Sequence, residues 1–223
     1  MLIQLPNVLS KTDLDAVREV LVDAPFVDGK LSAGNVARLV KHNEEVDLHA
    51  QEVQQLNNLV MGKLVQHPVY RAAALPMKVA APFYARYTEG MEYGDHVDDP
   101  IMHADKPYRS DISITIFLND ATDYAGGELA IRTSFGVNEV KLNAGDAIMY
   151  PSSSVHHVNK VTSGIRVVAV TWVQSLVRDP AQREILYDLY QVREKMLAEN
   201  PDDELTKQID RSYVNLVRMW SDV

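Results

Sequence analysis

Two histidines and one aspartate are the residues of this chain best suited to metal chemistry. His96 and Asp98 stand two positions apart, and His156 follows far downstream. Two imidazoles and one carboxylate bind a divalent metal while leaving coordination positions open, which is the ligand set of non-haem Fe(II) oxygenases. The same set also suits Zn²⁺. A zinc hydrolase or another metal-dependent enzyme is therefore an alternative at this point.

A single arginine supplies the second chemical element. Arg166 lies ten residues after His156, near the start of the apolar, β-branched run Ile165 to Trp172. We expect this run to be a buried strand paired back toward His156. A buried guanidinium needs an anion, and its planar fork fits a carboxylate through two hydrogen bonds. A 2-oxo acid with a second carboxylate would satisfy the metal and the arginine together.

Strands are the elements that must position these residues. Side chains two apart on a strand share a face, so we expect His96 and Asp98 to lie together on one strand. His156 follows a turn rich in Pro and Ser, and Val155 to Val161 is predicted as the next strand, ending at a turn over residues 162–164.

Further short strands and turns are typical of a jelly roll. Gly126-Gly127 is predicted as a turn before a strand over 128–132, and Asn143 to Asp146 as a hairpin turn between strands 137–142 and 147–150. Strands over 83–87 and 111–118 complete the pattern. The predicted fold class is mainly β with flanking helices and a double-stranded β-helix core.

Helices are predicted on both sides of the strands. Ser10 to Asp13 resembles a capping box that begins a helix reaching Leu21, and Glu44 to Gln66 is predicted as a second amphipathic helix. Residues 24–41 are expected to form a loop or hairpin near the site. Two helices, 184–199 and 203–220, follow the strands. Their apolar stripe is predicted to pack on the barrel first, with a homo-oligomer interface as the second interpretation.

The chain resembles a known enzyme family in five motifs that occur in the family's order. These are Tyr93-x-x-His-x-Asp98, Asp111-Ile-Ser-x-Thr-Ile-Phe-Leu118, Gly126-Gly-Glu-Leu129, Tyr150-Pro-Ser-Ser-Ser-x-His156 and Arg166 ten residues later. The order is similar to that of Fe(II)- and 2-oxoglutarate-dependent dioxygenases of the prolyl 4-hydroxylase type, and more narrowly to the bacterial PKHD-type hydroxylases. The likeness runs from Met1 through Asp179.

This resemblance implies specific roles and cosubstrates. His96, Asp98 and His156 would bind Fe(II), and Arg166 would bind the 5-carboxylate of 2-oxoglutarate. Tyr87 matches a tyrosine that hydrogen-bonds the cosubstrate in related enzymes, although a core aromatic is the alternative. With O2, the family's chemistry hydroxylates an unactivated C–H bond and releases succinate and CO2. Kinship with prolyl hydroxylases also implies L-ascorbate (vitamin C), which rescues oxidised iron.

Several nearby polar residues have simpler interpretations. Adjacent strand residues face opposite ways, so only one of His156 and His157 can point inward, and the family pattern favours His156. Asp95 and Asp99 are expected to be solvated or to form turns. Arg109 either meets a substrate or pairs with acidic neighbours. His103 lies in a loop and is either solvated or part of the substrate mouth.

Composition limits the remaining possibilities. The 223 residues are 46% hydrophobic, which predicts a globular domain with a proper core. The absence of cysteine excludes disulfides and thiolate metal sites, and the net charge of −9 disfavours a nucleic-acid surface. No apolar run is long enough for a membrane, so the cytoplasm is the expected location.

The expected organisation has three parts. Residues 1–78 form N-terminal helical elements packed on the barrel, 79–178 form the dioxygenase core, and 179–223 form a C-terminal helical extension. The substrate is expected to be a small molecule or a peptide. A non-catalytic sensor or binding module that keeps the jelly roll is the third functional alternative, and binding of 2-oxoglutarate distinguishes the enzyme from a metal enzyme of another class.

Overall fold

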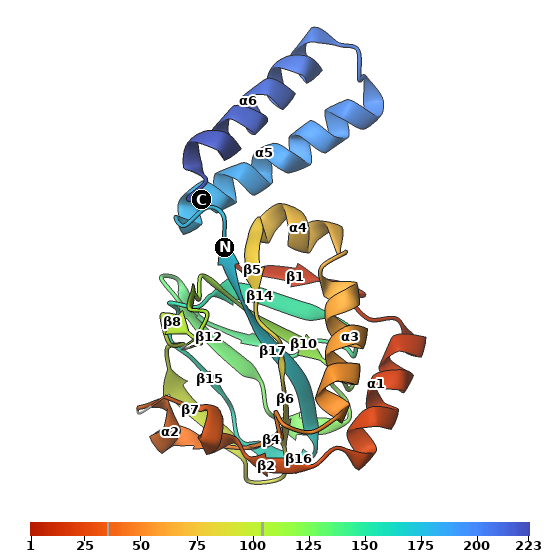
Figure 1. Ribbon diagram of the computed structural model, residues 1–223, viewed down its shortest axis with the longest axis vertical. Helices are drawn as coiled ribbons and strands as arrows, with labels where there is room; N and C mark the ends of the chain where they lie inside the picture. Colours follow the sequence, from red (N-terminus) through yellow and green to blue (C-terminus); the bar gives the residue numbers. More distant parts are fainter. Residues whose placement is uncertain (35, 104) are drawn as a thin grey trace.

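Two β-sheets face each other and form a barrel that is flanked by helices (Figure 1). The computed structural model describes residues 1–34, 36–103 and 105–223. The predicted 24–41 loop and the loop around His103 therefore each contain one residue, 35 or 104, that lies outside the described residues. The larger, eight-stranded sheet has the order β1-β14-β10-β17-β6-β4-β2, with β5 also pairing β17, and the five-stranded sheet has the order β13-β12-β15-β7-β3.

The strands of the larger sheet come from both halves of the chain. They are β1 (Ile3–Leu5), β2 (Phe26–Asp28), β4 (Glu44–Val46), β5 (Pro76–Val79), β6 (Phe83–Tyr87), β10 (Ile112–Phe117), β14 (Ala147–Pro151) and β17 (Arg166–Ser175). The smaller sheet holds β3 (Lys41–His42), β7 (Glu92–His96), β12 (Leu129–Thr133), β13 (Gly136–Val140) and β15 (His156–Val158). Two short pairs, β8 (Ile101–Met102) with β9 (Tyr108–Arg109) and β11 (Tyr124–Gly126) with β16 (Val161–Gly164), extend the barrel.

Six helices and one 3₁₀ turn accompany the described strands. They are α1 (Lys11–Asp23), the 3₁₀ turn Gly29–Ser32, α2 (Ala37–Val40), α3 (Glu52–Leu64), α4 (Pro68–Ala74), α5 (Pro180–Glu199) and α6 (Glu204–Trp220). The predicted capping box of α1 is confirmed, because the Ser10 hydroxyl accepts from the Asp13 backbone and the Asp13 side chain accepts from the Ser10 backbone. The predicted C-terminal helices are also confirmed.

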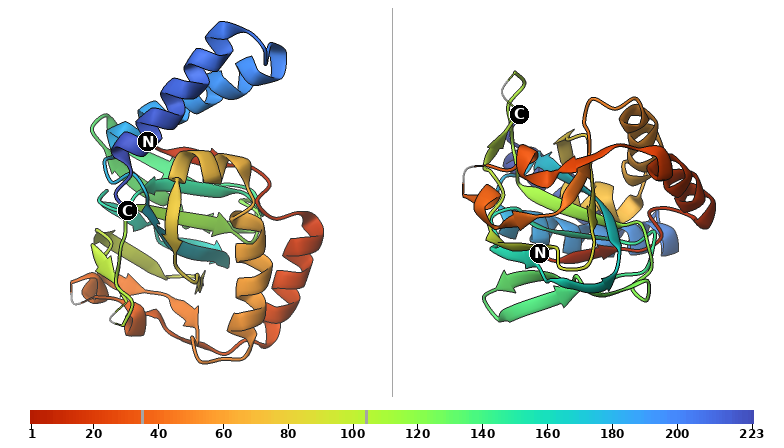
Figure 2. Two further views of the ribbon diagram at one scale, coloured as in Figure 1. Left: turned by 45° about the horizontal axis from the view of Figure 1, so that its top comes forward. Right: turned by 90° about the horizontal axis from the view of Figure 1, so that it is seen from below.

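The larger sheet separates two apolar layers. On β10, Ile112, Ile114 and Ile116 point to the main core cluster, which includes Leu14 and Val17 of α1 and Leu56 and Val60 of α3. These two helices lie together on one side of the barrel (Figure 2). The alternate residues face the barrel interior, where Phe117 and Val168 join a second cluster. Because side chains alternate along a strand, one sheet supports a core on its outer face and a site on its inner face.

The N-terminal part of the chain contains four short strands in addition to helices, and one of these strands replaces part of a predicted helix. Glu44–Val46 was predicted within a helix but is strand β4, which pairs with β6, and the helix begins only at Glu52. Short strands β1, β2 and β3 also join the sheets. The edge of β6 offers unpaired backbone groups to residues 44–46, and pairing with it outweighs the helical periodicity of this segment.

One predicted turn and one predicted hairpin were also wrong. Residues 162–164 belong to strand β16, which pairs with β11. The turn over Asn143 to Asp146 does not close a hairpin, because β13 pairs with β12 whereas β14 pairs with β1 and β10. This turn passes the chain from one sheet to the other, a connection typical of a jelly roll.

The C-terminal hairpin packs on the barrel only at its base. Helices α5 and α6 project away from the sheets beyond α4 (Figure 1), and Leu186 and Arg183 of α5 are buried near the base. Farther along, apolar side chains such as Val192 and Leu205 are exposed. The expectation that the whole stripe packs on its own barrel was therefore wrong.

Candidate functional site

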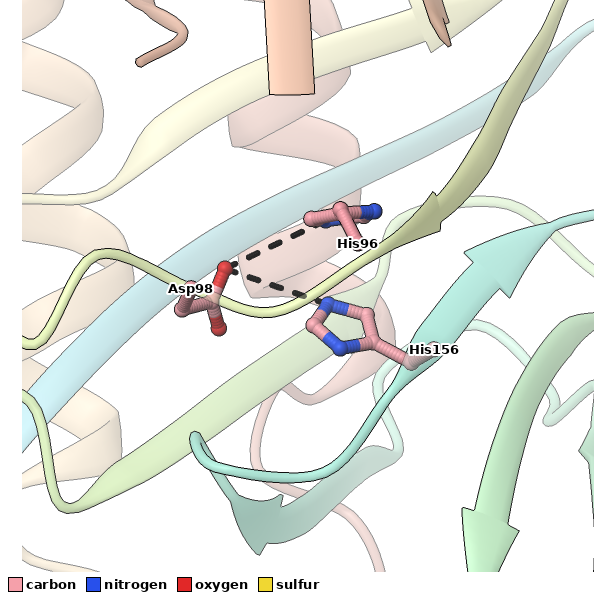
Figure 3. A group of neighbouring side chains, drawn as sticks. All are labelled: His96, Asp98 and His156. Atoms are coloured by element: carbon pink, nitrogen blue, oxygen red, sulfur yellow. Dashed lines mark ion pairs between the residues drawn. The ribbon is translucent and has the colours of Figure 1, made fainter. Parts of the chain in front are cut away.

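His96, Asp98 and His156 come together inside the barrel (Figure 3). Their ligand atoms all lie within 4.8 Å of one another. Asp98 Oδ1 is 4.0 Å from His96 Nε2 and 3.8 Å from His156 Nε2. The two histidines are register partners on neighbouring strands β7 and β15, which explains why residues sixty positions apart share one site. Such a cluster suits a divalent metal held on one face.

Backbone contacts orient both imidazole rings. His96 Nδ1 lies 2.8 Å from the Gly94 carbonyl, and His156 Nδ1 lies 3.0 Å from the Ser154 carbonyl. Because a carbonyl only accepts, each Nδ1 carries the hydrogen and each Nε2 lone pair is left for a metal. Burial, together with the nearby His156, lowers the pKa of His96 to about 4. The ring is therefore neutral at physiological pH, as a metal ligand must be.

Asp98 is held from the opposite sheet. Its Oδ2 accepts a hydrogen bond from the Ser113 hydroxyl on β10, and Ser113 Oγ lies 2.8 Å from Ser152 Oγ. Asp98 was expected on the same strand as His96, but β7 ends at His96 and Asp98 lies just beyond it. Asp98 and His96 still face the same site, as the spacing predicted. A side-chain hydrogen bond, and not strand pairing, holds Asp98 in this position.

Arg166 is buried in the same interior, with 1% of its surface exposed. The guanidinium lies 5.0 Å from the Tyr87 ring centre and 5.7 Å from that of Phe117. Its Nε and Nη1 have no hydrogen-bond partner among the described residues. Since a buried cation without an anion is costly, this arrangement fits the carboxylate of a bound molecule.

The pairing of the arginine strand differs from the prediction. β17 does not pair with the His156 strand; Arg166 is the register partner of Tyr87 on β6. Gly127, with φ of +67°, lies beside it, and a Cβ there would stand 3.1 Å from Arg166 Cδ. Glycine tolerates this positive φ and leaves room for the arginine stem. Gly126 ends β11 and Gly127 lies in the short connection to β12, so the position predicted as a turn has a packing role instead.

Tyr87 is beside Arg166, as its predicted role requires. It is buried, and burial raises the pKa of its hydroxyl to about 12 despite the opposing effect of Arg166. The phenol is therefore neutral and retains a proton that it can donate. This geometry is compatible with contact to a cosubstrate.

One cavity joins these groups. It has a volume of about 1020 Å³ and is lined by the triad, Arg166 and Tyr87. Its lining also includes Ser32 to Gly34, Ala37 and Lys41, so the predicted 24–41 segment reaches the site through its described residues. A space of this size accommodates a cosubstrate together with a small molecule or a side chain of a peptide.

The other candidate polar residues near the motifs are not part of the triad. His157 faces outward, where its Nδ1 is 2.7 Å from Asp95 and its Nε2 is 3.0 Å from Asn159. Arg109 pairs with Asp111 through two hydrogen bonds. Asp95 and Asp99 are both exposed, as expected, and Asp99 also lines the cavity, together with His103. Of the adjacent histidines His156 and His157, only His156 therefore belongs to the triad.

Sequence reasoning missed several residues of the cavity wall. Lys41 Nζ pairs with Glu45 Oε1 at 2.5 Å, and both side chains are buried. Trp172 Nε1 is buried without a partner among the described residues, beside Phe83. The alternation of β17 places Trp172 on the face of Arg166 and would have indicated it. Glu45 carried no such signal, because residues 44–46 were predicted as helix, and Lys41 was the last residue of the segment predicted as a loop or hairpin.

Comparison with known sequences gives a consistent family. Residues 82–174 match the family model of the 2OG-Fe(II) oxygenase superfamily. A PKHD-type hydroxylase of Thioalkalivibrio sulfidiphilus is 51% identical, and one of Acaryochloris marina is 44% identical. Both alignments cover all of this chain and all of the relative. The resemblance inferred from the five motifs is confirmed.

Solved structures confirm the fold. A prolyl-4-hydroxylase of Pseudomonas putida aligns with a TM-score of 0.54 at 17% identity, covering 78% of this chain and 92% of the other. A viral collagen prolyl hydroxylase from Paramecium bursaria Chlorella virus-1 aligns with a TM-score of 0.55 at 15% identity, covering 78% and 96%. The predicted jelly-roll core with flanking helices is therefore correct.

Proposed function

This chain belongs to the PKHD-type hydroxylases of the 2OG-Fe(II) oxygenase superfamily, and we propose that His96, Asp98 and His156 hold its Fe(II). Arg166 then binds the far carboxylate of 2-oxoglutarate, and Tyr87 assists it. The protein is an Fe(II)- and 2-oxoglutarate-dependent dioxygenase that hydroxylates its substrate. The assignment of these residues to metal and cosubstrate is our proposal.

The unpartnered guanidinium of Arg166 is the observation that supports this assignment best. Two of its nitrogens are buried without partners in the described structure, in the cavity that also contains the triad. The chemistry of a zinc hydrolase or a metal-dependent isomerase does not by itself require a buried cation there. A dicarboxylate with a keto group beside one carboxylate would use the triad at one end of the site and Arg166 at the other.

Each residue has a separate task in this proposal. The two imidazoles would hold the metal through their Nε2 lone pairs, and Asp98 would hold it through Oδ1. Fe(II) with 2-oxoglutarate and O2 supplies the oxidising power for C–H hydroxylation, and succinate and CO2 are released. The apolar inner face around Phe117 and Val168 excludes water from the charged groups.

The proposal extends to partners. We propose a small-molecule or peptide substrate, with L-ascorbate as a reductant that restores Fe(II). The three-part division at residues 78 and 178 and the cytoplasmic location stay predictions. No helix among the described residues is long and apolar enough to cross a membrane. The exposed apolar residues of the α5–α6 hairpin support self-association as a further part of this proposal.

Anaerobic titration of the Fe(II)-loaded protein with 2-oxoglutarate tests the site directly. Chelation of the keto acid produces a weak visible charge-transfer band, which we expect for the natural sequence. Arg166→Ala should need at least about tenfold more 2-oxoglutarate because it loses a charge-assisted bidentate contact, worth roughly 1.5–3 kcal/mol.

Arg109→Ala is the matched control, since this arginine is already paired with Asp111 outside the cavity lining. It should leave the 2-oxoglutarate requirement unchanged. Absence of the band from fully loaded protein would contradict the cosubstrate assignment. A normal band with an unchanged requirement in Arg166→Ala would show that Arg166 is structural.

A further inference from the structure

We propose that Ser113 is a positioning residue for the metal site, whose hydroxyl turns the Asp98 carboxylate so that Oδ1 faces the two imidazoles. This inference rests on the proposed function, because it concerns the same triad. Ser113 belongs to β10 of the larger sheet, whereas Asp98 follows β7 of the smaller sheet. The contact therefore joins the two walls of the barrel at the metal site.

The two oxygens of Asp98 have different surroundings. Oδ2 accepts the hydrogen bond from Ser113. Oδ1 is the atom that lies 4.0 Å from His96 Nε2 and 3.8 Å from His156 Nε2. One oxygen is thus fixed by the protein while the other is directed at the ligand cluster. Metal ligands are commonly oriented by such outer hydrogen bonds.

The number of available protons determines which hydroxyl donates in each of the two hydrogen bonds. Ser113 has one proton, and a carboxylate can only accept, so that proton goes to Asp98. The 2.8 Å contact between Ser113 Oγ and Ser152 Oγ then uses the proton of Ser152. Ser113 is 0% exposed and Ser152 1% exposed, so water does not compete for these bonds. Ser152 also lies on the turn that leads to His156, so the two hydroxyls link Asp98 to the segment that carries this ligand.

Asp98 has particular need of this contact. His96 and His156 sit on paired strands, and each ring is also fixed through Nδ1. Asp98 lies past the end of β7, so no sheet pairing defines its backbone. Without the hydrogen bond from Ser113, the Asp98 carboxylate would rotate freely. Metal binding would then have to fix its orientation, and the lost conformational entropy would weaken the affinity. Loss of an outer hydrogen bond typically lowers metal affinity 10–100-fold.

Titration with Co(II) alone, in the complete protein and without 2-oxoglutarate, tests this role. We expect Ser113→Ala to raise the Co(II) dissociation constant about tenfold or more. In an Asp98→Ala background, whose two remaining histidines bind Co(II) only weakly and are titrated at higher Co(II) concentrations, the same substitution should change the dissociation constant less than about threefold, because the carboxylate on which Ser113 acts is gone. This comparison separates positioning from general damage to the barrel.

Ser110→Ala is the matched control. Ser110 is also buried and donates to the backbone carbonyl of Asp99 in the same segment, but it does not touch the carboxylate. It should leave Co(II) affinity within about threefold of the natural value. An equal loss in Ser110→Ala, or a loss by Ser113→Ala that persists without Asp98, would overturn the proposal. So would an unchanged affinity in Ser113→Ala. If the natural sequence itself bound no Co(II), the triad assignment would fail instead.

Discussion

At the scale of single residues, the contrast between His156 and His157 shows how strand alternation selects a ligand. One ring faces the triad, and its neighbour makes hydrogen bonds on the outside with Asp95 and Asn159. We therefore expect His156→Ala to abolish tight Fe(II) or Co(II) binding, whereas His157→Ala should bind metal within about threefold of the natural protein. Calorimetric titration of both variants measures this difference. Comparable losses in the two would show that the wrong histidine has been assigned.

The pH dependence of stability is a second prediction for a single residue. The pKa of His96 is about 4 in the folded, metal-free protein but near its ordinary value of 6.5 when unfolded. Between these values the unfolded chain binds a proton that the folded chain does not, so the free energy of unfolding falls as pH is lowered from 6.5 to 4. The loss should be at most about 3 kcal/mol.

Urea unfolding of the metal-free protein at pH 7, 5.5 and 4.5 measures this loss. The His96→Asn variant lacks the titrating ring and should show a shallower decline over the same range. Parallel declines in the two proteins would mean that other groups cause the acid sensitivity.

The cluster of the triad and the burial of Arg166 could be predicted because their residue types and spacing are visible in the sequence, whereas Tyr87 was indicated only by the resemblance to related enzymes. Ser113 could not be given its role, since its contact with Asp98 depends on how β10 faces the end of β7. The same holds for the pairing of Arg166 with Tyr87. Spacing shows which side chains share a face of one strand, but it does not show which strands become neighbours.

At the scale of elements, the short segment from β3 to β4 connects the two sheets. Lys41 belongs to the smaller sheet and Glu45 to the larger one, and their ion pair is completed by Ser32, whose hydroxyl is 2.8 Å from Lys41 Nζ and 2.6 Å from Glu45 Oε2. Lys41 also lies over the ring of Tyr93, which stacks on His96. The pair therefore supports the wall next to the metal site.

We expect Lys41→Met to destabilise the protein by about 3–5 kcal/mol, because it leaves Glu45 buried without its partner. Lys63→Met is the control, since Lys63 is half exposed and pairs with Asp13 at the surface. That change should cost less than about 1 kcal/mol. Chemical denaturation of the two variants provides the comparison, and similar small losses would show that the buried pair is dispensable.

The capped helices and the long strands β10 and β17 were predictable because each has a strong local signal. The incorrect secondary-structure predictions concern short segments. Residues 44–46 form a strand because β6 has a free edge beside them, and residues 162–164 form one because β11 does. Local sequence contains no information about such edges, so tertiary pairing decided these cases.

At the scale of the whole molecule, the α5–α6 hairpin is the most distinct part. It leaves the barrel after β17 and exposes Val192 on α5 and Leu205 on α6, whereas the cavity lies within the barrel. If the hairpin joins two copies, Val192→Glu and Leu205→Glu should shift a dimer toward monomer without changing metal affinity.

Light scattering coupled to size-exclusion chromatography, over a range of protein concentrations, measures this shift. Lys195→Glu serves as the control, because it adds negative charge to α5 at a residue that is already polar and exposed. A natural protein that is monomeric at every concentration would refute self-association through the hairpin.

The two apolar layers of the larger sheet have a consequence for how this enzyme can change over time. The main cluster, under α1 and α3, lies on the outer face, whereas Trp172 and Phe83 line the cavity; Val53 of α3 contributes to both. Exchange of Trp172 or Phe83, which line the cavity and are not members of the main cluster, should therefore cost less folding free energy than substitution of the buried Lys41–Glu45 pair. Substitutions on the inner face can therefore alter substrate specificity while the outer core is unchanged. Directed evolution confined to the inner face should yield altered specificity with few unstable variants.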